Sequence, residues 1–218
     1  MKSSPLDYLL STLFVVLISA IAILMPWSLS AHLRYVLHGY APLASVALFM
    51  IAYGVVSAVT VRVLLRLKSI PPGSYQMLTS REFIYWKLLT VIYRLGEASL
   101  RPFTPVFFRP LLVILFGAKV GRDVAMGGAI DDPYMVEIGS DSVLGHNSLV
   151  SANYVRGGDF VCGRVKIGKN VTIGPYAVIF PGCDIGDNVT IAGGSQVMPN
   201  TRIPSGENWR GNPARKWL

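Results

Sequence analysis

The first third of the chain is dominated by two apolar runs that contain no charged residue. Residues 8–29 read YLLSTLFVVLISAIAILMPWSL, and residues 41–61 read APLASVALFMIAYGVVSAVTV. Each run reaches the roughly 20 residues that a helix needs to cross about 30 Å of hydrocarbon. The pattern predicts two transmembrane helices, joined by a short polar connection at residues 30–40 into a hairpin over residues 1–68. The alternative for the first run is a cleaved signal peptide, but those are usually shorter and more basic at the start.

A weaker apolar pattern follows the helix-breaking sequence Ile70-Pro-Pro-Gly73. Residues 81–95 and 105–118 are apolar, but each stretch is short for a span and is interrupted by charge. Aromatic residues in the first stretch are typical of the headgroup level of a bilayer. The pattern predicts amphipathic helices in the membrane interface over residues 69–119. The alternative is that both helices are ordinary core helices packed on the domain that follows.

From residue 138 onward the pattern changes to an aliphatic residue at every sixth position, with one break. The next position is often glycine, and the fifth position is small in nine of the eleven sixes. The first positions are Ile138, Leu144, Val150, Val161, Ile167, Ile173, Ile179, Ile185, Ile191, Val197 and Ile203.

A period of six keeps neither one face of an α-helix nor the strict alternation of an ordinary strand. It does fit a triangular prism, in which each six forms one short strand and one corner, and three sixes close a coil. The aliphatic residue points inward, and stacked coils satisfy one another's backbone hydrogen bonds at a spacing of about 4.8 Å. The repeat therefore predicts a parallel β-helix over residues 120–218.

These repeats resemble the left-handed β-helix, hexapeptide-repeat acyltransferases. The order VEIGSDSVLGHNSLVSAN, a short loop, VKIGKNVTIGPYAVIFPGCDIGDNVTIAGGSQV and a final WRGNPARKW is similar to the galactoside, maltose and xenobiotic O-acetyltransferase branch. The apolar segments in front resemble membrane-anchored relatives that modify lipids or polysaccharides. The expected fold class is thus membrane-anchored and mainly β: two transmembrane helices, interfacial helices and a left-handed parallel β-helix.

Composition and charge agree with a membrane location. Apolar residues make up 52% of the 218 residues and charged residues only 15%, against about 25% in a typical soluble domain. The net charge is +8, and ten Lys or Arg residues fall between Arg62 and Arg122. Since basic residues favour the cytoplasmic side, we expect a multi-pass protein of the inner (cytoplasmic) membrane with both its N-terminus and its C-terminal domain in the cytoplasm. Nucleic acid is not an expected partner, because the excess charge is juxtamembrane.

The resemblance implies an acyl-CoA co-substrate, usually acetyl-CoA, in a cleft between adjacent prisms of a homotrimer. Gly193 and Gly194 match the small residues beside which the pantetheine arm lies, and their alternative role is simple coil packing. Arg215 and Lys216 match basic residues near the nucleotide phosphates, and their alternative role is that of solvated tail charges. A guanidinium suits phosphate recognition.

Acyl transfer also needs a general base, which is a histidine in this superfamily. In the O-acetyltransferase branch it lies on the loop that corresponds here to residues 153–159. That loop has no histidine, and Asn153 stands at the expected place. His146, at the third place of LGHNSL, matches the base position of lipid A and sugar N-acyltransferases, and its alternative role is that of an exposed corner residue. Asp159 and Asp141 are candidates to orient its imidazole.

The sequence thus predicts an integral membrane acyltransferase. It would move an acyl group, most often acetyl, to a hydroxyl or amine of a lipid-linked saccharide or other membrane-associated acceptor. The alternative is a catalytically inactive trimeric scaffold at the membrane. A metal site is not expected, because a carbonic anhydrase on the same prism needs three histidines and only His146 lies among the repeats. Cys162 and Cys183 have neither metal-ligand nor disulfide spacing, which suits a reducing compartment.

Overall fold

The computed structural model describes residues 5–77 and 79–217, which divide into two compact units. The helical unit contains Met1–Ile70 and Arg81–Thr104, and the prism unit contains Pro71–Ser80 and Pro105–Leu218. Each unit is described by itself.

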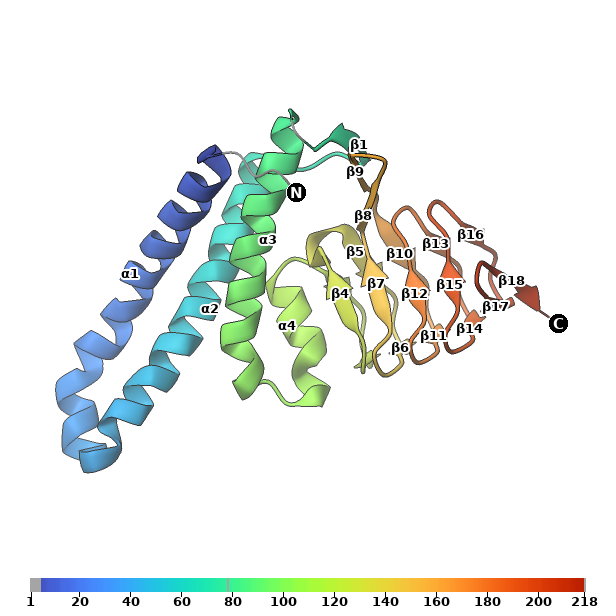
Figure 1. Cartoon of the computed structure of the whole chain (residues 1–218). Helices are drawn as coiled ribbons and strands as arrows, with labels where there is room; N and C mark the ends of the chain where they lie inside the picture. The colour runs from blue at the N-terminus through green and yellow to red at the C-terminus, as the bar shows by residue number, and fades with distance from the viewer. Residues whose placement is uncertain (1–4, 78, 218) are drawn as a thin grey trace. The chain divides into compact units, whose positions relative to one another are not determined.

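Three long helices form the helical unit (Figure 1). Helix α1 spans Pro5–Leu37 and helix α2 spans Ala41–Leu67, with a 3-10 turn at His38–Tyr40 between them. Helix α3 spans Arg81–Leu100 and packs against both, and a 3-10 turn at Arg101–Phe103 follows it. Aliphatic and aromatic side chains on α1, α2 and α3 let the three helices pack against one another.

The polar connection that the sequence predicts at residues 30–40 is longer than the turn in the structure. Residues 30–37 contain neither glycine nor proline, so α1 continues to Leu37 and the turn is only three residues long. Among residues 5–77 and 79–217, one helical stretch, Asp7–Leu67, qualifies by length and composition to cross a membrane, rather than the two spans that the sequence suggested. Only 11% of its most apolar window is buried inside the protein.

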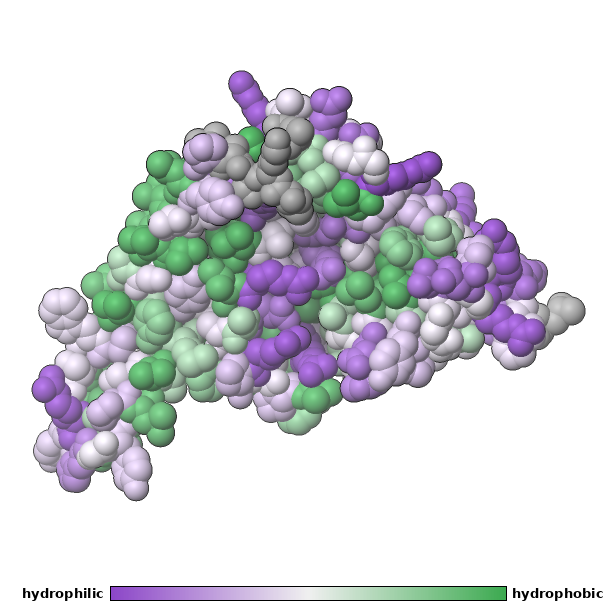
Figure 2. Space-filling model, in the orientation of Figure 1, coloured by the Kyte–Doolittle hydropathy of each residue, from purple (hydrophilic) through white to green (hydrophobic). Residues whose placement is uncertain are grey.

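Apolar side chains cover the outside of α1 and α2. Leu13 and Leu24 are 57% and 59% exposed, and Figure 2 shows hydrophobic residues gathered over these two helices. Between α1 and α3 the unit also buries an ion pair, in which the Lys87 ammonium donates to the Asp7 carboxylate.

Three parallel sheets form the faces of the prism, and the coils of the chain that supply their strands stack on one another (Figure 1). The first sheet contains β2 (Lys119–Val120), β5 (Val136–Ile138), β10 (Val165–Ile167), β13 (Asp184–Ile185) and β16 (Arg202–Ile203). The second contains β3 (Ala125–Met126), β6 (Val143–Leu144), β11 (Thr172–Ile173), β14 (Thr190–Ile191), β17 (Asn208–Gly211) and the antiparallel β18 (Ala214–Trp217). The third contains β4 (Ala129–Asp131), β7 (Leu149–Ser151), β12 (Val178–Ile179) and β15 (Gln196–Val197).

The predicted β-helix is confirmed by the register of these strands. In the late coils paired residues are 18 positions apart, as for Lys166 with Asp184 and Thr172 with Thr190, so three sixes make one coil. Ten of the eleven predicted first-place aliphatics are buried, with at most 4% exposure, as are the eight small fifth-place residues from Ser142 to Ser195. Val161 is the exception, because it lies on a hairpin outside the prism.

That hairpin interrupts one coil. Strands β8 (Asn153–Arg156) and β9 (Asp159–Cys162) form it, and the extra residues raise the separation of paired strands on either side to 29 positions. Strand β1 (Gly73–Gln76) pairs with β9 in antiparallel register. The segment after Ile70-Pro-Pro-Gly73 thus adds a strand to the hairpin, which the sequence pattern did not indicate.

The start of the prism is covered by a short helical segment. It comprises the 3-10 turn Val106–Phe108 and helix α4 (Arg109–Leu115), which contact β2 and β3. A first coil, β2 to β4, precedes the recognisable repeats and ends in the 3-10 turn Pro133–Met135. We find α4 to be shorter than the helix suggested for residues 105–118, because Gly117 has a positive φ of 107° that ends it.

Candidate functional site

The corners that follow the second sheet form one edge of the prism, which we call the His146 edge. In successive coils it comprises residues 145–148, 174–177 and 192–195. The stacking is fixed by backbone hydrogen bonds: the Tyr176 N–H donates to the His146 carbonyl at 3.0 Å, and the Gly194 N–H donates to the Pro175 carbonyl at 2.8 Å. His146 and the Gly193-Gly194 pair, 47 positions apart in sequence, therefore lie on the same edge two coils apart, or about 10 Å.

His146 is exposed on this edge, as its position at the third place of its six suggests. Its imidazole meets the Tyr176 ring edge-on, with 6.0 Å between ring centroids and 86° between planes. Within the described part of the chain its side chain makes no hydrogen bond or ion pair. The imidazole is therefore accessible to a second molecule.

The backbone at Gly194 is open, whereas Gly193 packs closely against Pro175 of the preceding coil. A Cβ at Gly194 would have no atom within 4 Å, and φ is 68° there, which favours glycine. A Cβ at Gly193 would lie 3.1 Å from the Pro175 carbonyl oxygen. A linear chain could approach this backbone closely.

The C-terminal hairpin β17–β18 adds basic residues one coil further on. Arg210 lies opposite Arg215 in the antiparallel register, and the Gly211 N–H donates to the Ser195 hydroxyl of the His146 edge at 3.2 Å. Lys216 forms an ion pair of 2.7 Å with Glu207, and this hydrogen bond lowers the pKa of the Glu207 carboxyl. Arg210 packs over the Trp217 ring at 4.6 Å, and the Arg215 guanidinium donates to the Ala214 carbonyl at 2.9 Å, so both guanidinium groups have neutral partners rather than a carboxylate. The sequence had not singled out Arg210.

Asn153 belongs to a different edge, where the hairpin leaves the third sheet. Its amide donates to the carboxylate of Asp132, which is only 3% exposed and also accepts a hydrogen bond from the Tyr134 hydroxyl at 3.1 Å. Sequence reasoning missed Asp132. The pair of acids in AIDDPY gave a weak signal, because two adjacent aspartates within a strand-rich repeat usually face solvent.

The two acids considered as orienters of His146 lie elsewhere. Asp159 accepts a hydrogen bond from the Ser74 hydroxyl at 3.2 Å, on the strand pair β1–β9. Asp141 occupies a left-handed corner position, with φ of 62°, on the edge between the first and second sheets. Within residues 5–77 and 79–217, neither carboxylate forms a hydrogen bond or ion pair with the imidazole.

The outer face of the first sheet carries charges of alternating sign. Its outward residues are Lys119, Glu137, Lys166, Asp184 and Arg202. Lys119 pairs with Glu137 at 2.7 Å and Arg202 with Asp184 at 3.6 Å. The hydrogen bond and charge of Lys119, with the charges of Lys166 and Arg164, lower the pKa of Glu137.

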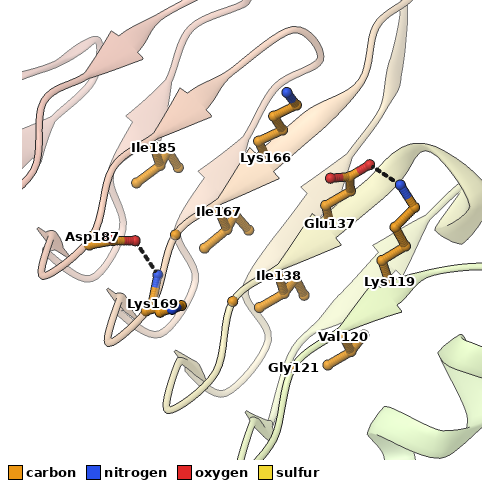
Figure 3. Close-up of a pocket in the computed structure, with 12 residues that line it drawn as sticks. Lys119, Val120, Gly121, Glu137, Ile138, Lys166, Ile167, Lys169, Ile185 and Asp187 are labelled. Carbon is orange, nitrogen blue, oxygen red and sulfur yellow. Dashed lines mark hydrogen bonds and ion pairs between the residues drawn. The ribbon is translucent and has the colours of Figure 1, made fainter.

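A groove of about 460 Å³ runs beside this charged ladder (Figure 3). Lys119, Glu137 and Lys166 line one side, and the corner backbones of Gly121, Gly139 and Gly168 line another. The corner amides already donate within the prism, for example Gly139 to Ile167 and Gly168 to Ile185. The groove therefore offers side-chain charges rather than free backbone donors.

The other two faces carry fewer charged residues in their strands: Asp131 on β4, and Arg210, Arg215 and Lys216 on the C-terminal hairpin β17–β18. The outward residues are Ala125, Val143, Thr172, Thr190 and Asn208 on the second sheet, and Ala129, Leu149, Val178 and Gln196 on the third. The His146 edge separates these two faces.

Both cysteines are buried and unpaired with each other. Cys162 and Cys183 are 3% and 1% exposed, and burial raises the pKa of each thiol to about 11. Across residues 5–77 and 79–217, His, Cys, Asp and Glu side chains form no group of three or more that could hold a metal ion.

The repeats match the family model for the bacterial transferase hexapeptide (six repeats) over residues 164–199. Together with the observed β-helix, this match confirms the resemblance to the hexapeptide-repeat acyltransferases.

Several known proteins are similar over part of their length. The chain is 31% identical over 108 residues to the putative acetyltransferase YvoF of Bacillus subtilis, covering 50% of this chain and 62% of that protein. It is 27% identical over 146 residues to delta-poly-L-ornithine synthetase of Acinetobacter baumannii, covering 65% and 11%. It is 31% identical over 134 residues to gamma carbonic anhydrase 2 of Arabidopsis thaliana, covering 50% and 46%. The chain thus spans less than two thirds of each of these relatives.

Among solved structures, galactoside acetyltransferase in complex with coenzyme A is 25% identical, with 58% of this chain and 80% of that chain covered and a TM-score of 0.48. A maltose O-acetyltransferase from Clostridium difficile 630 is 21% identical, with 78% and 95% covered and a TM-score of 0.36.

Proposed function

We propose that this protein is a membrane-anchored acyltransferase. It moves an acyl group, most often acetyl, from acyl-CoA to a hydroxyl or amine of a membrane-associated acceptor such as a lipid-linked saccharide. The observation that carries the proposal is the His146 edge, where an accessible imidazole, an open glycine backbone and an arginine-bearing hairpin follow one another along successive coils.

The residues suit the shape and charge of acyl-CoA. The anionic phosphates would lie by Arg210 and Arg215, since guanidinium groups bind phosphate oxygens in two-point contacts. The linear pantetheine arm would pass Gly193 and Gly194, where side chains are absent. The thioester would then lie near His146, about two coils away. Acyl-CoA supplies an activated carbonyl group there.

His146 is the proposed general base. Its imidazole accepts the proton of the acceptor hydroxyl or amine as that group attacks the thioester carbonyl. The new ester or amide bond forms, the carbon–sulfur bond breaks, and the proton returns from the imidazolium to the departing thiolate of CoA. Products are the acylated acceptor and free CoA.

Asn153 and Asp132 form a second polar site on another edge. An amide cannot accept the proton, so we assign Asn153 to holding the Asp132 carboxylate, and Asp159 to anchoring β1 against the hairpin. The scaffold alternative rests on the same absence of a histidine from residues 153–159. A carbonic anhydrase activity is not proposed, because the prism sequence contains one histidine.

Copies of the prism are proposed to associate as a homotrimer through the second and third faces, whose strands carry fewer charges than the first. Burying the charge ladder of the first sheet would require dehydrating five charged side chains, which is costly unless each is well paired. The His146 edge, between these two less charged faces, would then lie at the seam between copies. Native mass spectrometry of the detergent-solubilised chain tests this assembly.

The helical unit is proposed to anchor the enzyme. We infer that α1 and α2 cross the membrane as a hairpin, with α3 packed beside them and both ends of the hairpin in the cytoplasm. Support comes from the exposed apolar surface of α1 and α2 and from the basic residues that follow α2. Confinement to the membrane plane favours an acceptor that is itself in the membrane.

The decisive experiment measures thiol release from acetyl-CoA by the full chain in membranes, with lipid extracts as acceptors. The proposal predicts that His146→Ala lowers the rate by about 10²- to 10⁴-fold, the usual contribution of a general base. His32→Ala, the same chemical change in the helical unit, should leave the rate unchanged. Equal rates for wild type and His146→Ala would exclude His146 as the base. A lack of turnover in the wild type would favour the scaffold.

A further inference from the structure

Tyr176 occupies a backbone conformation that disfavours its side chain. Its φ is 59°, in the left-handed region where residues other than Gly, Asn and Asp are strained. The other left-handed residues at corners of the described prism follow this preference: Asp123, Asp132, Asp141, Asn147, Asn170, Asn188 and Asn200, with glycine at further corners. Tyr176 is the aromatic exception, so the chain tolerates strain at this corner.

Packing does not account for the exception. Tyr176 is 61% exposed, and the interior position of its six is filled by the neighbouring Ala177, which is fully buried. An asparagine would fit the turn better, as it does at equivalent corners. The strain is therefore not offset by burial, and strained residues of this kind gather at functional sites.

The position of the Tyr176 ring suggests a role for this strained backbone conformation. It meets the His146 imidazole edge-on at 6.0 Å, an arrangement that aromatic pairs prefer. On the next coil lie Gly193 and Gly194, which have no side chains to cover it. Tyr176 thus stands between the imidazole and the open backbone stretch.

A general base normally has its ring orientation fixed by a hydrogen bond from its second nitrogen to a carboxylate or carbonyl. Within the described residues the His146 side chain has no such bond, and the two acids that the sequence offered as its orienters, Asp141 and Asp159, lie elsewhere in the prism unit. The Tyr176 ring is the side-chain contact that the structure provides instead.

We propose that Tyr176 is the positioning residue for His146: its ring, held at a strained corner, fixes the imidazole by edge-to-face packing in the orientation that acyl transfer requires. The inference rests on the proposed function. Because the contact is made by the ring, the phenolic hydroxyl is not needed.

The test compares Tyr176→Asn with Tyr176→Phe in the full chain, by kinetics of thiol release and by thermal unfolding. Asparagine suits the left-handed turn, so Tyr176→Asn should keep or raise the melting temperature. Its kcat should fall roughly ten- to a hundredfold, as misplacement of a catalytic group does, while KM for acetyl-CoA stays within about twofold. Tyr176→Phe should retain the wild-type kcat, and its NMR spectrum should keep contacts between the ring and His146.

Asn170→Gly is the matched control, because it alters a left-handed corner on another edge and should leave kcat unchanged. The inference is overturned if Tyr176→Asn keeps the wild-type kcat, if Tyr176→Phe loses as much activity as Tyr176→Asn, or if only KM changes. A wild-type protein without thiol release would remove the proposed function itself, and this inference with it. If the wild type is active and the Tyr176 substitutions leave its kcat unchanged, this inference is wrong while the proposed function stands.

Discussion

The two units use the same aliphatic residues in opposite ways. On α1, Leu13 and Leu24 are more than half exposed, whereas Ile173 and Ile179 in the prism are completely buried. The helices satisfy their backbone hydrogen bonds internally, so their side chains are free to face lipid. Each prism coil depends on its neighbours for those bonds and must turn its aliphatics inward to close. Apolar composition therefore has a different meaning in the two halves of the chain.

Cysteine labelling should show the largest difference between the two units. Gly39→Cys, at the turn between α1 and α2 where a Cβ meets no atom within 4 Å, should react with a membrane-impermeant maleimide in intact cells. Val155→Cys on the hairpin should react only after permeabilisation. The opposite order would reverse the proposed orientation.

The native cysteines provide the low background that this experiment needs. Thiolates are the reactive species, and a pKa of about 11 leaves roughly one thiol in ten thousand ionised at pH 7. Labelling of Cys162 and Cys183 in the folded protein should therefore rise with pH towards 11 and be negligible at pH 7. Rapid labelling of the unmodified chain at pH 7 would contradict their burial.

A pair of truncations tests the packing difference directly. Ile173→Ala should lower the free energy of unfolding of the prism by about 2–5 kcal/mol, because it removes a fully buried side chain and leaves a cavity. Leu13→Ala on the exposed side of α1 should change the unfolding free energy in detergent by less than about 0.5 kcal/mol. Denaturant unfolding of both variants is the measurement. Similar losses would mean that α1 is a core helix.

A smaller effect is expected for polar burial in the prism. Asn153→Leu removes one donor to the buried Asp132 carboxylate and should destabilise the prism by about 1–3 kcal/mol. Asn208→Leu makes the same change at an exposed strand position and serves as the control. If Asn208→Leu destabilises the protein as much as Asn153→Leu, the hydrogen bond to Asp132 is not the cause.

The smallest effect concerns the charge ladder. Glu137→Gln should cost about 0.5 kcal/mol at pH 7, because its partner Lys119 is largely exposed and the pair is screened by solvent. The folded-state pKa of Glu137 is lowered, so its contribution is present above the unfolded pKa of about 4.3 and disappears as pH falls through the folded value. Urea unfolding of wild type and variant should converge in acid. If the difference in unfolding free energy between wild type and Glu137→Gln persists in acid, the ion pair with Lys119 is not the source of that difference.

The sequence predicted the prism far better than the site. Spacing alone identified ten inward aliphatics and the small fifth-place residues, because a strict period leaves few geometries that bury every first position. It misplaced Val161 and missed β1, since a hairpin outside the repeat has no period and β1 pairs with residues more than 80 positions away. The sequence placed the turn between α1 and α2 correctly but predicted too many residues in it. Residues 30–37 are polar enough to suggest a loop, yet they form the last turns of α1.

The candidate site shows the same division. His146, Gly193 and Gly194 became candidates because they match positions in the family that the repeats resemble, and only coil stacking shows that they share an edge with Tyr176 between them. Asp132 and Arg210 were missed because each is significant through a partner that is distant in sequence or across a hairpin.

The sequence by itself determined the period of the prism, its inward residues and the apolar character of the first third, since these depend on local spacing and composition. Tertiary structure decided which corners stack into one edge, where the buried carboxylate lies and which tyrosine meets the imidazole. The reason is that these relations follow from the number of residues in each coil, and one irregular hairpin shifts every later corner.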